Sequence, residues 1–266
     1  MIRKLVISYR SNQYLVKNML IRDIKQRYVG SMFGLFWFFF QPIMTVLIYT
    51  FVFSFVLKAK LGPEFGGMNF SIWLISGLVP WMFFNEVLVR GTNSLLDNSS
   101  LIKKTIVDTR WIILSNTLSS LFSFLVFLVI VFILLGVFGI ALSLKVILLP
   151  CYILMMGIFA FGLALSLSAL NVYLRDIAQF VSIFLNIWFY LTPIVYPISI
   201  IPEKYRFFLE INPVYHFISG FRFALLSTNE PMNISSFLYV AFFSILTLVM
   251  GLKIFNRLKD GFADVL

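Results

Sequence analysis

The sequence has few charges, one cysteine and one histidine, and each scarcity excludes a class of protein. Only 12% of its 266 residues are charged, whereas a soluble domain carries about 25%. The lone cysteine, Cys151, cannot form an intramolecular disulfide, and its apolar neighbours favour ordinary packing. The lone histidine, His216, has no cysteine or carboxylate cluster beside it, so we expect an aromatic-belt residue rather than a metal ligand.

Motifs for nucleotide hydrolysis and hydrolytic chemistry are also missing. The sequence has no GxxxxGK[ST] phosphate loop, so this chain is not expected to hydrolyse ATP by itself. It has no HExxH, CxxC or GxSxG motif, no filter-like loop of an ion channel and no paired carboxylates inside an apolar run. Asp23, Asp108 and Asp176 stand isolated in the sequence. We therefore expect no enzyme activity, and no cofactor or metal held by this chain.

Apolar residues, in contrast, are abundant. They make up 61% of the chain, and its mean hydropathy is +0.97, which is too apolar for a soluble core of this length. A membrane-crossing helix needs about 20 apolar residues. Six continuous runs meet this need, at about 32–57, 68–89, 111–136, 146–170, 177–197 and 234–254. The expected fold is an all-α membrane protein with six transmembrane helices in a single domain, residues 32–257.

The basic residues predict how the chain is oriented. With the N-terminus in the cytoplasm, fifteen Lys and Arg fall in cytoplasmic segments and six in outer segments. Residues 1–31 and a tail, 258–266, are therefore expected in the cytoplasm, and no cleavable signal is visible. The net charge of +10 is mainly this topology signal, with some attraction to anionic lipid, and does not favour nucleic-acid binding.

Residues 11–29 predict an amphipathic helix that lies at the cytoplasmic membrane surface. Leu20 and Ile21 fall on its apolar face and Arg22 on its polar face, although Met19 also falls on the polar side. Such a helix either anchors the chain or docks a cytoplasmic partner.

The longest predicted cytoplasmic connection joins the second and third runs and mixes leucines with charges. Ser99 or Ser100 is expected to cap a short helix that starts at Leu101. This helix is either a simple connector or a lever that another protein pushes. Before it, Glu86 and Arg90 are four residues apart and predict an ion pair at the end of the second span.

The outer segment 202–228 is too charged and too interrupted to cross a membrane. Pro202 is expected to open a short helix at Glu203, and Asn212 and Pro213 to end it and start a second one. We expect two short amphipathic helices at the outer interface.

Small residues form a ridge on the fourth run, at Ala160, Ala164 and Ser168, near Gly162. Such ridges let helices approach closely. The ridge predicts close packing within the chain, with a dimer seam as the alternative.

Four stretches of the sequence, taken together, resemble one known family. They are "RDIKQRYVGSMFGLFWFFFQPI", "SGLVPWMFFNEVL", "LNVYLRDIAQFVSIFLNIWFYLTPIVYP" and "INPVYHFISGFRFALL". In combination they are specific, and they are similar to the permease subunits of ATP-binding-cassette exporters for cell-surface polysaccharides, namely O-antigen, capsule and teichoic acid.

The resemblance implies a homodimer with a lateral pore in the bacterial inner membrane. It implies a separate nucleotide-binding ATPase subunit in two copies, which carries the ATP and Mg, and a lipid-linked polysaccharide as the substrate. In the family, the front helix and the loop between spans two and three meet the ATPase. The corresponding candidates here are Arg22, Lys25, Arg27, Leu96, Asp97, Leu101, Lys103 and Lys104.

The resemblance also implies that the two outer helices form a gate. The gate candidates are Pro202, Tyr205, Asn212, Pro213, Phe221 and Arg222. Aromatic rings suit the C–H faces of sugars, so the candidates for pore lining are Phe36, Trp37, Phe40, Trp188 and Tyr190. A lipid-facing or packing role stays open for each of them.

O-antigen export is favoured by overall similarity, and capsule or teichoic acid export is the nearest alternative. A permease for small molecules or drugs belongs to the same superfamily. A membrane scaffold or enzyme of glycan assembly, without transport, is the alternative from a different class.

Overall fold

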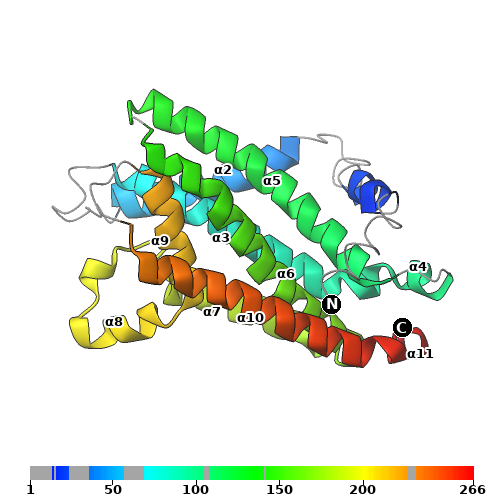
Figure 1. Ribbon diagram of the computed structural model, residues 1–266. Coiled ribbons are helices and arrows are strands. Elements are labelled where there is room, and N and C mark those ends of the chain that lie inside the picture. The colour runs from blue at the N-terminus through cyan, green and yellow to red at the C-terminus, as the bar shows by residue number, and fades with distance from the viewer. Residues whose placement is uncertain are drawn as a thin grey trace.

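The structure is a computed structural model, and it describes residues 14, 16–23, 36–56, 69–104, 108–140, 142–226 and 232–266. All regular structure in these ranges is helical, which confirms the all-α prediction. Figure 1 shows long helices packed side by side. In chain order the elements are α2 (Phe36–Thr50), the π-helical η1 (Phe51–Val56), α3 (Phe70–Asp97), α4 (Ser99–Lys104), α5 (Arg110–Val137), η3 (Leu144–Leu148), α6 (Leu149–Tyr173), α7 (Asp176–Leu191), η4 (Ile198–Ile200), α8 (Glu203–Glu210), α9 (Pro213–Leu225), α10 (Ile234–Leu258), η5 (Lys259–Gly261) and α11 (Phe262–Val265).

Four described helical segments are long and apolar enough to cross a membrane: Phe70–Asp97, Arg110–Val137, Leu144–Tyr173 and Ile234–Gly261. Two further apolar helices, Ile43–Ser54 and Asp176–Leu191, are shorter. The structure therefore supports four full-length spans, and the six-span fold stays a prediction.

The fifth predicted span, 177–197, is wrong at its end because the helix stops at Leu191. Pro193 has no amide hydrogen and disfavours helical backbone before it, and Thr192 is accordingly extended, at φ −106° and ψ 131°. The 16 residues of α7 rise about 24 Å. This is less than the hydrocarbon thickness of about 30 Å.

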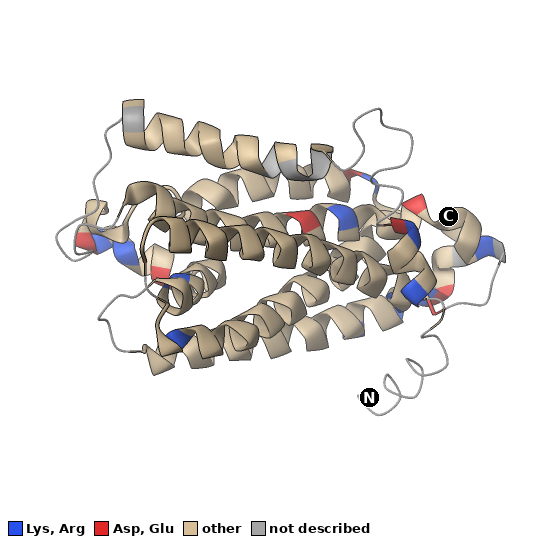
Figure 2. Ribbon diagram, turned by 90° about the horizontal axis from the view of Figure 1, so that it is seen from above, with Lys and Arg blue, Asp and Glu red and all other residues tan. Residues whose placement is uncertain are grey.

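Charged residues gather toward the two ends of the bundle, and the middle of most helices carries none (Figure 2). Helix 16–23, α4 and α11 lie at one end, and α8 lies at the other (Figure 1). We call these the α4 end and the α8 end. Helix 16–23, α4 and α11 all belong to segments that are predicted to be cytoplasmic. Their common position at one end of the bundle agrees with the predicted topology.

Close helix contacts at small residues organise the centre of the bundle around α6. A Cβ atom added at Gly251 of α10 would lie 2.2 Å from the carbonyl oxygen of Gly162. A Cβ atom added at Gly91 of α3 would lie 2.7 Å from the Cβ atom of Ala164. Ala160, Ala164 and Ser168 are fully buried within the chain, so this ridge packs internally, as predicted, and is not a dimer seam.

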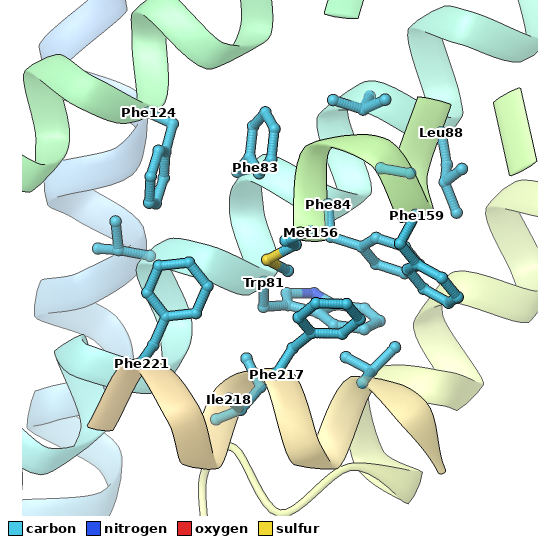
Figure 3. Packing of buried hydrophobic residues seen from close by; sticks show 14 of the residues in the cluster. Trp81, Phe83, Phe84, Leu88, Phe124, Met156, Phe159, Phe217, Ile218 and Phe221 are labelled. Atoms are coloured by element: carbon cyan, nitrogen blue, oxygen red, sulfur yellow. The ribbon is translucent and has the colours of Figure 1, made fainter. Parts of the chain in front are cut away.

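Aromatic side chains fill the space between α3, α6 and α9 (Figure 3). The ring centroids of Phe84 and Phe159 lie 5.5 Å apart, and Phe159 lies 5.3 Å from Phe217. Phe221 meets Phe124 of α5 edge to face at 5.8 Å. In lipid, such packing replaces the hydrophobic effect as the force that holds helices together.

The two short outer helices begin where the sequence predicts, at Glu203 and Pro213. The Asn212 side chain caps α9 by accepting a hydrogen bond from the Val214 amide at 3.0 Å. However, α9 is not an interfacial helix, because Phe217, Ile218 and Phe221 are fully buried against the core. Only α8 has the predicted exposed position. The aromatic face of α9 is buried because it completes the packing between α3 and α6.

His216 joins the outer helices to α10. Its Nε2 lies 2.6 Å from the Glu210 carbonyl oxygen, and its Nδ1 lies 2.6 Å from the Ser236 hydroxyl. Its ring lies 4.6 Å from that of Tyr239, and burial lowers the pKa of His216. The neutral imidazole therefore suits this position, with Nε2–H donating to the carbonyl.

A substitution test follows from the glycine contacts. Gly162→Ala would place its Cβ 2.5 Å from the Leu248 amide nitrogen, so α6 and α10 must separate. Such overpacking costs about 1–3 kcal/mol. We expect a melting temperature in detergent that is lower by about 2–4 °C per kcal/mol.

The matched control is Gly157→Ala on the same helix, where an added Cβ meets no atom within 4 Å. This variant should melt at the same temperature or slightly higher, because alanine favours helix over glycine by up to about 1 kcal/mol. Equal melting temperatures for the two variants would contradict the backbone contact.

Candidate functional site

Helix 16–23 lies against the α4 end of the bundle and buries a face that the sequence did not predict. Val16 and Met19 are 4% and 7% exposed, whereas Ile21 is 37% exposed. The predicted membrane-facing side, which includes Ile21, is thus not the side that packs on the bundle, and the burial of Met19, which the sequence places on the polar side, was not predicted. Polar contacts of the next two residues, Arg22 and Asp23, with α3 set the rotation of the helix instead.

Arg90 of α3 holds two carboxylates at this end. It donates to Asp23 of helix 16–23 and lies 3.4 Å from Glu86 on its own helix. The three side chains are between 20% and 29% exposed, so the group is only partly solvated. The predicted Glu86–Arg90 pair is confirmed. Asp23, which has no carboxylate partner nearby in the sequence, pairs with an arginine 67 positions away.

Arg22 makes a second link, which runs to the junction of α3 and α4. Its guanidinium donates to the Asn98 side-chain oxygen at 2.7 Å, and the Asn98 side chain donates to the Ser94 carbonyl at 2.9 Å. The Asn98 carbonyl accepts from the Leu101 amide at 3.0 Å. The short helix α4 thus begins at Ser99, earlier than predicted, and Asn98 rather than a serine organises its start.

A cavity of about 370 Å³ opens between helix 16–23, α3, α4 and α5. Its size falls within the range of ligand pockets, about 300–1,000 Å³. Its lining is mostly polar and includes Arg22, Asn93, Asp97, Ser115 and Asn116. Such a cavity can receive the side chains of a partner and hydrogen-bond to them.

The predicted coupling residues are partly gathered here. Arg22, Asp97 and Leu101 line the cavity, Leu96 is half-buried and Lys103 is exposed. Lys25, Arg27 and the Lys104 side chain lie outside what the structure describes. Near the start of α5, Asp108 forms an ion pair with Arg110.

Asn171 is a polar side chain that the sequence reading did not single out. It is fully buried at the α4 end of α6. It donates to the Thr92 carbonyl of α3 at 3.0 Å and accepts from the Ala178 amide in the first turn of α7 at 3.2 Å. A lone asparagine at the end of a long apolar run was the available signal.

The described pore-lining candidates differ in exposure and in contacts. Phe36 and Phe40 stack at 4.9 Å, Phe36 is exposed and Tyr190 is 59% exposed. Trp188 is engaged in packing and donates from Nε1 to the Asn212 oxygen at 2.9 Å. The Trp37 side chain lies outside the described part.

The gate candidates divide between the exposed and the enclosed side of the outer segment. Tyr205 on α8 is 49% exposed, and Pro202 and Pro213 precede or open the two helices. Phe221 lies in the core, and Arg222 points inward to the turn after α7. Phe221 therefore packs the bundle and does not line an outer opening of this chain.

Comparisons with known proteins identify the family of this chain. A family model described as ABC-2 type transporter matches residues 14–226. The O-antigen export system permease protein RfbA of Klebsiella pneumoniae is 33% identical over 246 residues, which cover 92% of each chain.

More distant relatives are similar over the same extent. The O-antigen export system permease protein RfbA of Myxococcus xanthus is 26% identical over 94% of each chain. The polysialic acid transport protein KpsM of Escherichia coli is 23% identical over 92% of this chain and 94% of its own length. With four long apolar helices and a family match over most of its length, this chain belongs to the ABC-2 type transporter family of membrane proteins.

Proposed function

We propose that this chain is the permease subunit of an ATP-driven exporter of lipid-linked polysaccharide, with O-antigen as the favoured substrate. The observation that carries the proposal is the 33% identity over 92% of both chains with an O-antigen export permease. The polysialic acid transport relative, at 23% identity, keeps capsule export as the second candidate.

The energy source in this proposal is a separate nucleotide-binding subunit. The sequence has no phosphate loop, so ATP and Mg belong to that partner. Two copies of the permease and two of the ATPase form the complex, in the bacterial inner membrane, with both ends of this chain in the cytoplasm. The α4 end then faces the cytoplasm and the α8 end faces outward.

The contact with the ATPase is placed at the cavity between helix 16–23, α3, α4 and α5. Arg22 and Lys103 are exposed here and offer positive charge to a partner. A displacement of helix 16–23 passes to α3 through the Asp23–Arg90 pair and to α4 through Arg22 and Asn98. Charged hydrogen bonds suit this role, since they fix orientation as well as distance.

The lateral pathway for the glycan is assigned to the dimer, with exposed aromatic residues of α2 and α7 along it. Phe36 and Tyr190 are described candidates whose side chains are exposed, and Phe40 stacks on Phe36. The α8 helix, with Tyr205 exposed, lies at the outward mouth.

Co-purification tests the proposed partner contact. This chain is expressed with the ATPase encoded beside it, and the pair is recovered through a tag on this chain. Arg22→Glu together with Lys103→Glu should lower the recovered ATPase about tenfold, because two lost charge contacts of about 0.7 kcal/mol each give that factor. Lys204→Glu on α8, at the opposite end, is the matched control and should recover as much ATPase as the unmutated chain.

The result also separates the alternatives. Failure of the unmutated pair to associate in several detergents would contradict the exporter and favour a scaffold or enzyme of glycan assembly. Loss of surface polysaccharide in a strain without the gene, restored by the unmutated gene, should accompany association. A complex that moves small amphiphiles while surface polysaccharide stays normal would instead indicate a small-molecule exporter.

A double-mutant cycle tests the link from helix 16–23 to α3. Asp23→Asn and Arg90→Gln are made singly and together, and melting temperatures are compared. A partly buried pair should show a coupling of about 1–2 kcal/mol, between the values for exposed and buried pairs. The control pair is Glu203 and Arg206, 4.0 Å apart with Glu203 90% exposed, which should show no measurable coupling. Additive effects at Asp23 and Arg90 would rule out the link.

A further inference from the structure

Arg222 carries a positive charge into the interior at the α8 end without a carboxylate beside it. Among the described residues, no Asp or Glu oxygen lies within 4 Å of its guanidinium, and its Nε is enclosed without a partner. Its two terminal nitrogens donate to the carbonyls of Pro193 at 2.9 Å and Ile194 at 2.8 Å. Arg222 is of intermediate exposure, and enclosing part of a cation is costly unless polar groups compensate its charge, as these two carbonyls do.

Residues of α3 form the other side of this position. The guanidinium carbon lies 3.5 Å from the centroid of the Trp73 ring, which is a cation–π contact. One turn further along α3, a Cβ at Gly77 would lie 2.6 Å from a terminal nitrogen of Arg222. The missing side chain at Gly77 therefore leaves the room in which the guanidinium lies.

The carbonyls that Arg222 binds belong to the turn that ends α7. Within this turn and the last turn of the helix, other carbonyls have donors of their own. The Trp188 carbonyl accepts from the Thr192 hydroxyl at 2.9 Å, and the Tyr190 carbonyl accepts from the Tyr196 hydroxyl at 2.7 Å. Non-helical backbone in apolar surroundings is tolerated only where the protein satisfies its polar groups. Arg222 supplies the donors for the carbonyls of Pro193 and Ile194.

The position of α7 depends on such contacts because its own packing is light. Only Val181, Leu185 and Phe189 of its sixteen residues are buried. A second tie reaches the same turn from the start of α9, where the Asn212 amide donates to the Thr192 hydroxyl at 2.8 Å.

We propose that Arg222 is a positioning residue for transport, which clamps the exit turn of α7 to α3 and α9 so that the outer ends of these helices move together. The inference rests on the proposed export function and adds to it a part that the family resemblance did not specify. Removing the clamp leaves ATP hydrolysis in place but frees the α7 exit, so that hydrolysis no longer drives export.

The clamp is measured first by chemical accessibility, which does not depend on the function. Val195 in the exit turn is 2% exposed, and Val195→Cys is made in a Cys151→Ser background and treated with a maleimide. Labelling should be slow with Arg222 in place. In Arg222→Met it should be about tenfold faster or more, as expected when hydrogen bonds from a charged donor are lost. Arg222→Lys keeps the charge and one donor to a carbonyl, and it should label at an intermediate rate.

Gly77→Ala tests the same clamp without changing the arginine. It should speed labelling in the chain that has Arg222, because its Cβ displaces the guanidinium, and it should add nothing in the Arg222→Met chain. Gly136→Ala, where an added Cβ meets no atom within 4 Å, is the matched control and should leave labelling slow. If Arg222→Met does not fold, Gly77→Ala and Arg222→Lys carry the test.

Export and ATP hydrolysis are then compared in the reconstituted complex. Arg222→Met should lose most ATP-driven export of lipid-linked polysaccharide while its ATP hydrolysis stays close to that of the unmutated complex, and Arg222→Lys should regain part of the export. Three results would each overturn the proposal. The first is unchanged labelling in Arg222→Met, the second is additive effects of Gly77→Ala and Arg222→Met on labelling, and the third is a proportional fall of ATP hydrolysis and export. If instead the unmutated complex exports nothing while the labelling results hold, the proposed function fails and the clamp stands as structure only.

Discussion

Backbone polar groups that leave a helix in apolar surroundings need partners from the protein itself, and this constraint determines both ends of the bundle. At the α4 end, the Asn171 side chain serves the Thr92 carbonyl and the Ala178 amide. At the α8 end, Arg222 serves two carbonyls of the turn after α7. The helix α7 is thus attached at each end by a side chain from a neighbouring helix.

These polar ties contrast with the centre, where α6 meets α3 and α10 through small residues. Gly162 and Gly251 bring two backbones into contact, which leaves little freedom for sliding or rotation. We therefore regard α3, α6 and α10 as a rigid unit. Helix 16–23 and α7 are attached to it by a few directional bonds, which can exchange partners at smaller cost than a packed core can rearrange.

The sequence predicts the features that depend on local chemistry. Four of the six apolar runs, the cap at Asn212 and the Glu86–Arg90 pair follow from local residue types and spacing, and they occur in the structure. Features set by distant partners were not predictable in this way. The buried face of helix 16–23 depends on Arg90, which is 67 positions from Asp23, and the depth of α9 depends on a space between α3 and α6. Pro193 indicates that α7 ends before it, but the apolar residues after Leu191 extended the predicted span to residue 197.

We propose that this chain forms a pathway through which ATP hydrolysis by a separate subunit moves lipid-linked polysaccharide. The most direct measurement places the purified complex in vesicles with the polysaccharide on one leaflet and follows its appearance on the other. We expect movement that requires ATP, this chain and the ATPase together. Movement without ATP, or hydrolysis that never moves the glycan under any condition tested, would contradict it.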